Sequence, residues 1–185
     1  MTRWQFAAGV IGLLLSTPAH ADGVSRWQPL IDQAAAHCGV PADWIARVMR
    51  AESGGRTTLD GRPTTSHAGA MGLMQLMPGT WAEMRAALSL GSDPHDPRDN
   101  IVAGACYLRR MYDRFGYPGA FAAYNAGPAR YADHLAKRRT LPAETVTYLA
   151  AVTGAPPGLP TPHVMSPITA PALFFVRAAA PETPV

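Results

Sequence analysis

Between about residues 22 and 152, apolar residues recur every three or four positions, the spacing that places them on one face of an α-helix. One such segment runs from Pro41 to about Ala51, and its apolar face is Trp44, Ile45, Val48 and Met49. A second segment follows Asp99 and stops at Gly116, with an apolar face of Ile101, Ala105, Leu108, Tyr112 and Phe115. Both patterns predict amphipathic helices that pack on a common core.

The ends of the other helices are indicated by proline, glycine and capping residues. Thr80 and Glu83 fit a capping box that would open a helix, and Asp99 fits a cap for the helix that follows it. Further helices are expected over Trp27–Cys38, Pro118–Tyr124, Pro128–Lys137 and Pro142–Val152. Because alternation of apolar and polar residues is hard to find, the fold is predicted to be all-α, with several short helices.

The first 21 residues have the pattern of an export signal. A positive charge at Arg3 precedes ten apolar residues, Phe6–Leu15, and then the small-residue triplet Ala19-His20-Ala21. This order predicts a cleaved signal peptide over residues 1–21 and a mature chain that starts at Asp22. A membrane anchor is the alternative, but ten apolar residues are far fewer than the roughly 20 that span a bilayer. We therefore expect export to the periplasm with no stable membrane insertion after cleavage.

Residues 153–185 form a proline-rich tail. Eight prolines in 33 residues exclude a long helix and favour extended chain. The short apolar stretch from Leu173 to Val176 could dock on the domain or contact a partner. The folded domain is therefore expected over residues 22–152.

Composition excludes several classes of protein. The net charge is only +3, and the 15 Arg and one Lys are scattered among 13 acidic residues, so no nucleic-acid-binding patch is predicted. The six His and two Cys show neither H-x-x-x-H nor C-x-x-C spacing, and we expect no metal and no cofactor. A serine hydrolase would need a G-x-S-x-G motif, which is missing.

The two cysteines, Cys38 and Cys106, admit two interpretations. In an exported protein a disulfide is the expected state, and it would tie an early helix to a central one. Alternatively, both residues are small buried thiols at helix-packing positions. Neither lies in a motif that suggests catalysis.

Three clusters carry candidate chemistry. In the first, Glu52 ends a predicted helix just before two glycines, where the negative end of the helix dipole favours a protonated carboxyl group. The second runs from Gly69 to Pro78 and combines glycines, methionines and the single amide of Gln75. The third places Tyr124 and Asn125 at a helix end. The alternatives are a solvated surface Glu, a core segment and an ordinary helix cap.

Taken together and in this order, the clusters resemble the goose-lysozyme-like lytic transglycosylases of the soluble-lytic-transglycosylase (SLT) type, glycoside hydrolase family 23. The resemblance rests on four motifs: E-S at Glu52, G-L-M-Q from Gly72, N-I-x-A-G-x-x-Y-L from Asn100 and A-Y-N-A-G-P from Ala123. It covers about residues 27–150 and implies a lysozyme-like catalytic domain around a glycan cleft. The chain departs from the family in Gly54-Gly55-Arg56 and in a longer polar connection over residues 57–65.

The resemblance also implies roles for individual residues. Glu52 would be the sole general acid and base in cleaving peptidoglycan glycan strands, with formation of 1,6-anhydro ends. Tyr124 would lie within reach of Glu52 and help set its ionisation. The residues expected to bind substrate are Ser66, Gly72, Leu73, Met74, Gln75 and Asn125.

Two other functions remain open. One is a lysozyme-type peptidoglycan hydrolase on the same fold, which would use water instead of the sugar hydroxyl. The other is a non-catalytic peptidoglycan-binding assembly subunit. The Glu-Ser-Gly-Gly sequence in a compact exported domain also resembles smaller family members associated with envelope-spanning secretion or conjugation machinery. We expect the protein to be a monomer.

Overall fold

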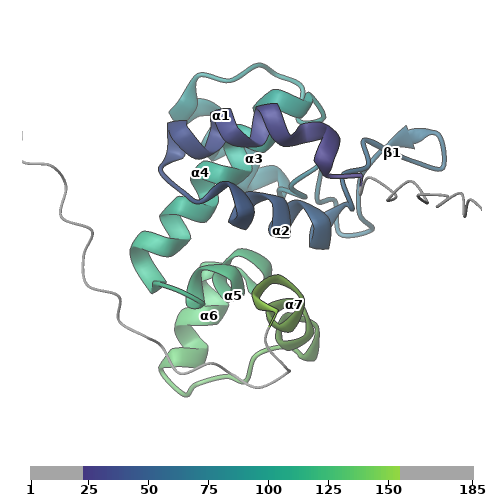
Figure 1. Ribbon diagram of the computed structural model, residues 1–185. Helices are drawn as coiled ribbons and strands as arrows, with labels where there is room; N and C mark the ends of the chain where they lie inside the picture. The colour runs from purple at the N-terminus through teal and green to yellow at the C-terminus, as the bar shows by residue number, and fades with distance from the viewer. Residues whose placement is uncertain (1–22, 155–185) are drawn as a thin grey trace, which may run out of the picture.

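The computed structural model describes residues 23–154, so the predicted signal peptide over 1–21 and nearly all of the proline-rich tail lie outside the described residues (Figure 1). Within this part of the chain the structure is predominantly helical, which confirms the predicted all-α fold. Its elements, in chain order, are the 3-10 turn η1 Ser25–Trp27, α1 Gln28–Cys38, α2 Ala42–Glu52, β1 Thr58–Leu59, β2 Arg62–Pro63, α3 Pro78–Leu88, α4 Pro97–Phe115, α5 Gly119–Ala126, α6 Pro128–Leu135 and α7 Ala143–Thr153.

Most helix ends agree with the sequence signals. Gly39 ends α1 in the left-handed conformation at φ 67°, and its amide donates to Ala35. Gly116 ends α4, and α2 stops at Glu52, so the candidate carboxylate occupies the last residue of its helix.

Two predicted caps are wrong. α3 begins at Pro78, so Thr80 lies inside the first turn and caps nothing. α4 is capped by Asp96, whose carboxylate accepts from the Asp99 amide at 2.9 Å. Proline is well suited to the first helical position, and in each case it starts the helix before the residue that we expected to cap it.

A short β-hairpin was not predicted. β1 and β2 pair antiparallel, with Thr58 opposite Pro63 and Leu59 opposite Arg62. Strands of two residues are too short to show alternation in the sequence. The hairpin lies in the long polar connection over residues 57–65 and projects from the side of the domain (Figure 1).

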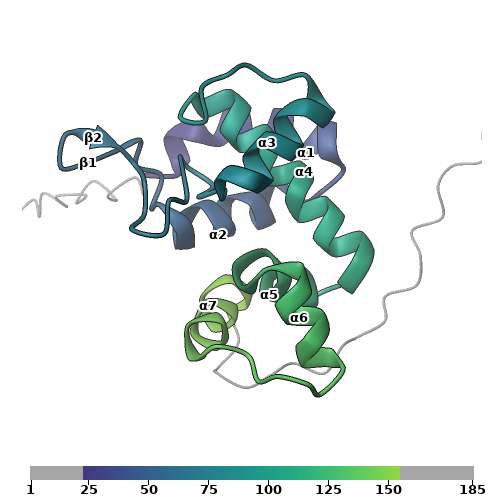
Figure 2. The ribbon, with the colours of Figure 1, turned by 180° about the vertical axis from the view of Figure 1, so that it is seen from behind.

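The long helix α4 organises the domain. It packs against α1, α2, α3 and α5, while α7 packs against α2 and α5. Both views show α1–α3 gathered around one part of α4 and α5–α7 grouped beside its other end (Figures 1 and 2). An aromatic cluster of Trp44, Tyr112, Tyr117 and Phe121 connects the two groups. None of the described helices is both long and apolar enough to cross a membrane.

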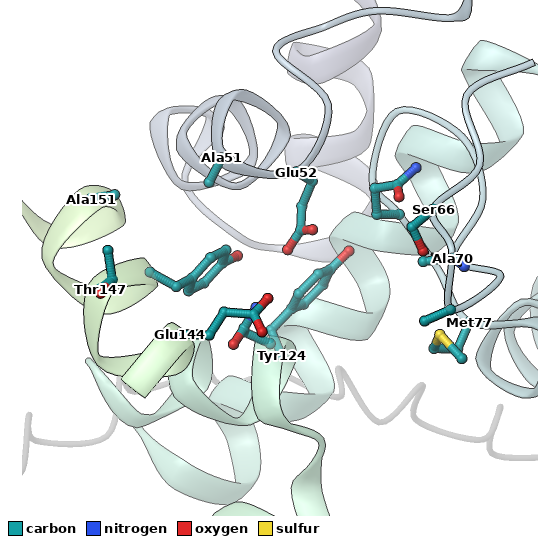
Figure 3. Close-up of a pocket in the computed structure, with 13 residues that line it drawn as sticks. Ala51, Glu52, Ser66, Ala70, Met77, Tyr124, Glu144, Thr147 and Ala151 are labelled. Carbon is teal, nitrogen blue, oxygen red and sulfur yellow. Dashed lines mark hydrogen bonds between the residues drawn. The ribbon is translucent and has the colours of Figure 1, made fainter. Parts of the chain in front are cut away.

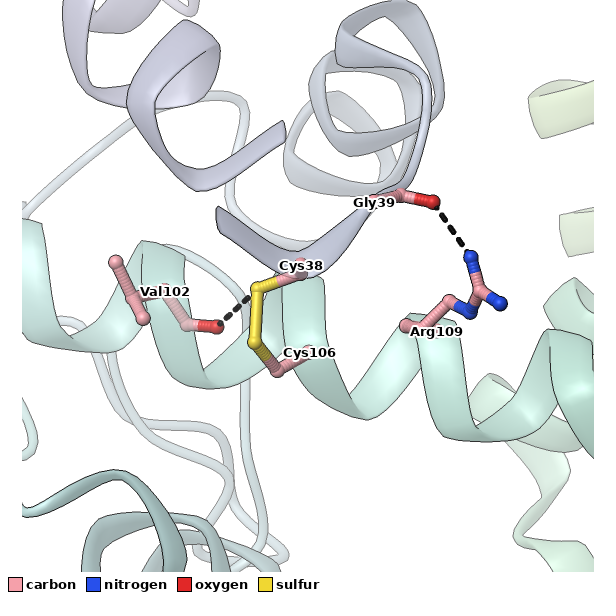
Figure 4. Close-up of a disulfide and its surroundings, with 5 residues drawn as sticks. All are labelled: Cys38, Gly39, Val102, Cys106 and Arg109. Atoms are coloured by element: carbon pink, nitrogen blue, oxygen red, sulfur yellow. Dashed lines mark hydrogen bonds between the residues drawn. A yellow bond between two sulfur atoms is a disulfide. The ribbon is translucent and has the colours of Figure 1, made fainter. Parts of the chain in front are cut away.

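Cys38 and Cys106 form a disulfide that joins α1 to α4, with the two Cα atoms 4.9 Å apart (Figure 4). Nearby, the Arg109 guanidinium donates to the Gly39 carbonyl at 2.9 Å. A covalent bond and a hydrogen bond thus hold the end of α1 on α4, at some distance from the glutamate at the end of α2.

Candidate active site

A cavity of about 690 Å³ opens at the C-terminal end of α2, between α5, α7 and the loop that follows the hairpin (Figure 3). It brings together side chains from segments that are far apart in the sequence. Its lining consists of Ala51, Glu52, Ser66, Ala68, Ala70, Gln75, Met77, Tyr124, Asn125, Glu144, Thr147, Tyr148 and Ala151.

Glu52 is half-buried in this cavity, and its environment raises the pKa of its carboxyl group from 4.5 to about 7. Burial is the largest cause, because a charged carboxylate loses hydration there. The Tyr148 hydroxyl opposes this effect by stabilising the carboxylate, whereas the negative charge of Glu144 adds to it. Near neutral pH, Glu52 can therefore both give and accept a proton.

Ser53, the second residue of the Glu-Ser motif, is a structural residue. It is 3% exposed, and its hydroxyl donates to the Leu73 carbonyl at 2.7 Å. The same oxygen accepts from the Gly55 amide at 3.1 Å. Ser53 thus fixes the turn after Glu52 and joins the end of α2 to the loop that contains Leu73.

Asn100 holds the same loop from the side of α4. It is fully buried, and its side-chain oxygen accepts from the Met74 amide at 2.7 Å. Its amide nitrogen donates to the carbonyls of Met71, at 3.1 Å, and Pro94, at 2.8 Å. A Cβ on Gly72 would lie 2.4 Å from that nitrogen, and Gly72 also has φ 76°. Glycine is therefore required at position 72 by the close approach of Asn100, whereas the sequence led us to expect Gly72 among the residues that bind substrate.

Met74 fits against two further motif residues. A Cβ on Gly104 would lie 2.5 Å from the Met74 Cβ, so only glycine leaves room for this side chain against α4. The Tyr124 hydroxyl donates to the Met74 carbonyl at 2.9 Å. All four motifs quoted above therefore meet at one loop, from Met71 to Leu76, beside the cavity.

The structure divides the residues expected to bind substrate into two sets. Ser66, Gln75 and Asn125 line the cavity. Gly72, Leu73 and Met74 do not, since Gly72 is buried under Asn100 and the side chains of Leu73 and Met74 are 1% and 0% exposed. The thioether that lines the cavity belongs to Met77, which is 45% exposed.

Two of the cavity's polar side chains are held by other protein groups. The amide nitrogen of Gln75 donates to the Gly72 carbonyl at 2.8 Å. The side-chain oxygen of Asn125 accepts from the Thr145 hydroxyl at 2.8 Å. These bonds fix the orientation of both amides, so each presents a defined polar edge to a ligand.

Tyr124 lies near Glu52. Because the two residues are close, the negative charge of Glu52 contributes to the raised pKa of Tyr124. Its single hydroxyl proton, however, is donated to Met74, so it is not available to the carboxylate. Tyr148 fills that position instead. Its hydroxyl is buried without a hydrogen bond of ordinary geometry, yet it is close enough to Glu52 to lower the glutamate's pKa.

Sequence reasoning missed Glu144 and Tyr148, which both lie on α7. They are four residues apart and therefore share one helix face, on which Thr147 and Ala151 also line the cavity (Figure 3). Glu144 is the one charged residue of α7, and a tyrosine four residues after it was the available signal. Nothing local in the sequence, however, places that face opposite Glu52.

A second, smaller cavity adjoins the first. The smaller cavity, of about 240 Å³, shares Gln75, Met77, Tyr124 and Asn125 with the first and adds the phenol ring of Tyr107. Together they form an extended depression suited to a polymer. Within residues 23–154, no group of three or more His, Cys, Asp or Glu is arranged to hold a metal ion.

The fold and this cavity define an all-α domain with a half-buried glutamate at the end of a helix in an open cleft. The family model described as "Transglycosylase SLT domain" matches residues 29–147, and the chain belongs to this family.

Among curated proteins, the chain is 37% identical over 126 residues to a transglycosylase of Enterobacteria phage PRD1, covering 67% of this chain and 43% of the relative. It is 38% identical over 98 residues to the soluble lytic murein transglycosylase of Escherichia coli K12, covering 49% of this chain and 14% of that protein. The chain thus spans less than half the length of either relative.

Two solved structures are similar. One is an inactive glutamate-to-glutamine mutant of lytic transglycosylase Slt from Pseudomonas aeruginosa, with TM-score 0.58, 30% identity and coverage of 69% of this chain and 22% of that one. The other is the 70 kDa soluble lytic transglycosylase from Escherichia coli, with TM-score 0.56, 27% identity and coverage of 69% and 24%.

Proposed function

We propose that this protein is a peptidoglycan lytic transglycosylase that cleaves the β-1,4 bond between N-acetylmuramic acid and N-acetylglucosamine. The observation that carries the proposal is Glu52, a half-buried glutamate in an open cleft with a pKa of about 7. Membership of the SLT family and the names of the relatives support it. The inactive mutant of the Pseudomonas enzyme, in which a glutamate is replaced, supports a catalytic glutamate.

In the proposed mechanism, protonated Glu52 donates its proton to the glycosidic oxygen as the bond to the muramyl C1 breaks. The muramyl N-acetyl group stabilises the positive charge that develops at C1. Glu52, now a carboxylate, then accepts the proton of the C6 hydroxyl, whose oxygen bonds to C1 and closes the 1,6-anhydro ring. A group whose pKa lies near the working pH can perform both transfers.

The other cavity residues would support this reaction without a cofactor. Tyr148 and Glu144 act on the proton affinity of Glu52 in opposite directions. Ser66, Gln75 and Asn125 present polar groups to the sugars. Met77 offers an adaptable apolar contact to a sugar face.

Glu144 is the reason to consider a second function, the hydrolysis of peptidoglycan. A hydrolase needs a second carboxylate as base or nucleophile, and Glu144 lines the same cavity as Glu52. If Glu144 activates water, the product would be an ordinary reducing end. We favour the lyase because the family's named members are transglycosylases.

The proposed setting is the bacterial envelope, where peptidoglycan lies. The predicted signal peptide would deliver the protein to the periplasm, where it would act as a monomer on glycan strands. An association with envelope-spanning secretion or conjugation machinery is part of the same proposal.

The decisive experiment is mass spectrometry of purified glycan strands after digestion. We expect the wild type to release fragments that each weigh one water less than the hydrolysed product, and Glu52→Gln to bind strands without cleaving them. Glu83→Gln is the matched control, since Glu83 is an exposed residue of α3 that pairs with Arg110 and does not line the catalytic cavity. Fragments without the mass deficit would identify a hydrolase, and no cleavage by the wild type would identify a binding protein.

A further inference from the structure

The turn that follows Glu52 is covered by the first residues that the structure describes. Gly54 and Gly55 both have positive φ, at 62° and 76°. A Cβ on Gly55 would overlap the Gly23 carbonyl, and a Cβ on Gly23 would lie 2.5 Å from the Gly54 carbonyl oxygen. The two segments therefore touch through their backbones. This contact and the positive φ values account for Gly54-Gly55, where the chain departs from its family's sequence pattern.

The carbonyl of Gly55 accepts two hydrogen bonds from the same N-terminal segment. The indole Nε1 of Trp27 donates to it at 2.9 Å, and the Arg26 guanidinium donates to it as well. The guanidinium also lies over the indole ring, 4.8 Å from the ring centre. Val24 is 2% exposed and anchors the segment in the hydrophobic core. Arg26 and Trp27, which together hold this carbonyl, are here called the N-terminal clamp.

The turn after Glu52 is thus held from two sides. The Ser53 hydroxyl joins it to the Leu73 carbonyl and accepts from the Gly55 amide. The N-terminal clamp holds the carbonyl of the same Gly55 from the other side. Helix ends fray, and Glu52 is the last residue of α2, so its position depends on how firmly this turn is held.

We propose that Arg26 and Trp27 are positioning residues: by holding the Gly55 carbonyl, they keep Glu52 at the place in the cavity where it meets the glycosidic oxygen. The inference rests on the proposed function, which makes Glu52 the acid. Neither clamp residue lines the catalytic cavity, so neither contacts the substrate. A small displacement of a catalytic group lowers the rate of the chemical step although the substrate still binds. The clamp should therefore act on kcat and leave KM unchanged.

The test removes each donor and keeps much of its side chain, with purified glycan strands as the substrate. Trp27→Phe loses the indole N–H, and Arg26→Met loses the guanidinium. Each should lower kcat by only about twofold, because the other donor remains. The double variant should lower kcat by about tenfold or more, beyond the product of the single losses, since the buried Gly55 carbonyl then has neither donor. Arg26→Lys combined with Trp27→Phe should recover the rate of Trp27→Phe alone, because lysine still offers a donor.

The pH profile provides a second measurement, which a loss of stability alone would not move. Burial is the main cause of the raised pKa of Glu52, with Tyr148 lowering this pKa and Glu144 adding to it. A displaced and better hydrated carboxyl group would have a lower pKa. In the double variant, the alkaline limb of the kcat/KM profile should therefore move to lower pH.

Arg109→Met is the matched control. The Arg109 guanidinium donates to the Gly39 carbonyl just beyond the end of α1, as that of Arg26 donates to Gly55 beyond the end of α2. This variant should lose stability and keep wild-type kcat and pH profile, measured well below its Tm. A double clamp variant that keeps wild-type kcat, or that loses activity only in proportion to its folded fraction, would overturn the positioning role. A wild type that cleaves no strands would instead overturn the proposed function, so the two failures are distinguishable.

Discussion

The Tyr124 hydroxyl donates its hydrogen bond to the main-chain carbonyl of Met74, 2.9 Å away, in the loop beside the candidate active site. Because a tyrosine has one hydroxyl proton, this bond makes Tyr124 a support for the loop. The hydroxyl that favours the charged form of Glu52 belongs to Tyr148. This arrangement assigns separate tasks to two tyrosines of the same cavity and leads to a direct test.

Tyr148→Phe is expected to raise the pKa of Glu52, because it removes the hydroxyl that stabilises the carboxylate. The alkaline limb of the pH profile of kcat/KM should move to higher pH, since the general acid keeps its proton longer. The fold should remain intact, because Tyr148→Phe keeps the buried ring. Tyr131→Phe, on α6 outside the cavity, should leave the profile in place. An unmoved limb in Tyr148→Phe would show that its hydroxyl does not act on Glu52.

Glu144→Gln is expected to produce the opposite shift. Its negative charge raises the pKa of Glu52, so the neutral amide should move the alkaline limb to lower pH. Under the lyase mechanism, activity at the optimum should fall by less than about tenfold, because Glu144 only tunes the acid. A loss of several orders of magnitude, with hydrolysed products from the wild type, would assign Glu144 the role of base. Glu83→Gln serves again as the comparison.

Glu52→Gln should change how stability depends on pH. In the wild type, the folded protein binds more protons at this site than the unfolded chain does between pH 4.5 and about 7. Wild-type stability should therefore fall as the pH rises through this window, by at most about 3 kcal/mol. The glutamine variant lacks this loss, so its advantage in Tm should grow from pH 4.5 to 7 and then level off. A constant difference in Tm across the window would contradict a raised pKa.

Replacing both Cys38 and Cys106 with Ala should lower the free energy of unfolding by about 4 kcal/mol, because the disulfide closes a long loop in the unfolded chain. Activity at low temperature should persist, since neither residue lines the catalytic cavity. Denaturant unfolding with and without reductant provides the measurement. Reductant should destabilise the wild type by a similar amount and leave the double variant unchanged, and a loss below about 1 kcal/mol would contradict the prediction.

The helices were predictable because their signals are local. The apolar face of α2, the glycine stops at Gly39 and Gly116 and the prolines near the helix starts are all readable within a few residues. The two wrong caps arose where two local signals compete, a proline at the first helical position and a polar residue further on. The hairpin left no readable pattern, because its strands are two residues long.

The motifs were readable in the sequence, but their physical purpose was not. Gly72 and Met74 were expected to bind substrate, yet they are buried. They are part of a packing arrangement in which Asn100 and Gly104 of α4 meet the loop from Met71 to Leu76. No local pattern indicates that a glycine is needed for a side chain 28 or more residues away.

The sequence by itself thus determined the helices, the family resemblance and the candidate glutamate, because helical periodicity and motif spacing are properties of neighbouring residues. The tertiary structure decided the proton affinity of Glu52 and the composition of its cavity. Burial, the Tyr148 hydroxyl and the Glu144 charge set that affinity, and both residues come from α7, at the far end of the domain in sequence. Such through-space effects depend on distance in the fold, which the order of residues along the chain does not reveal.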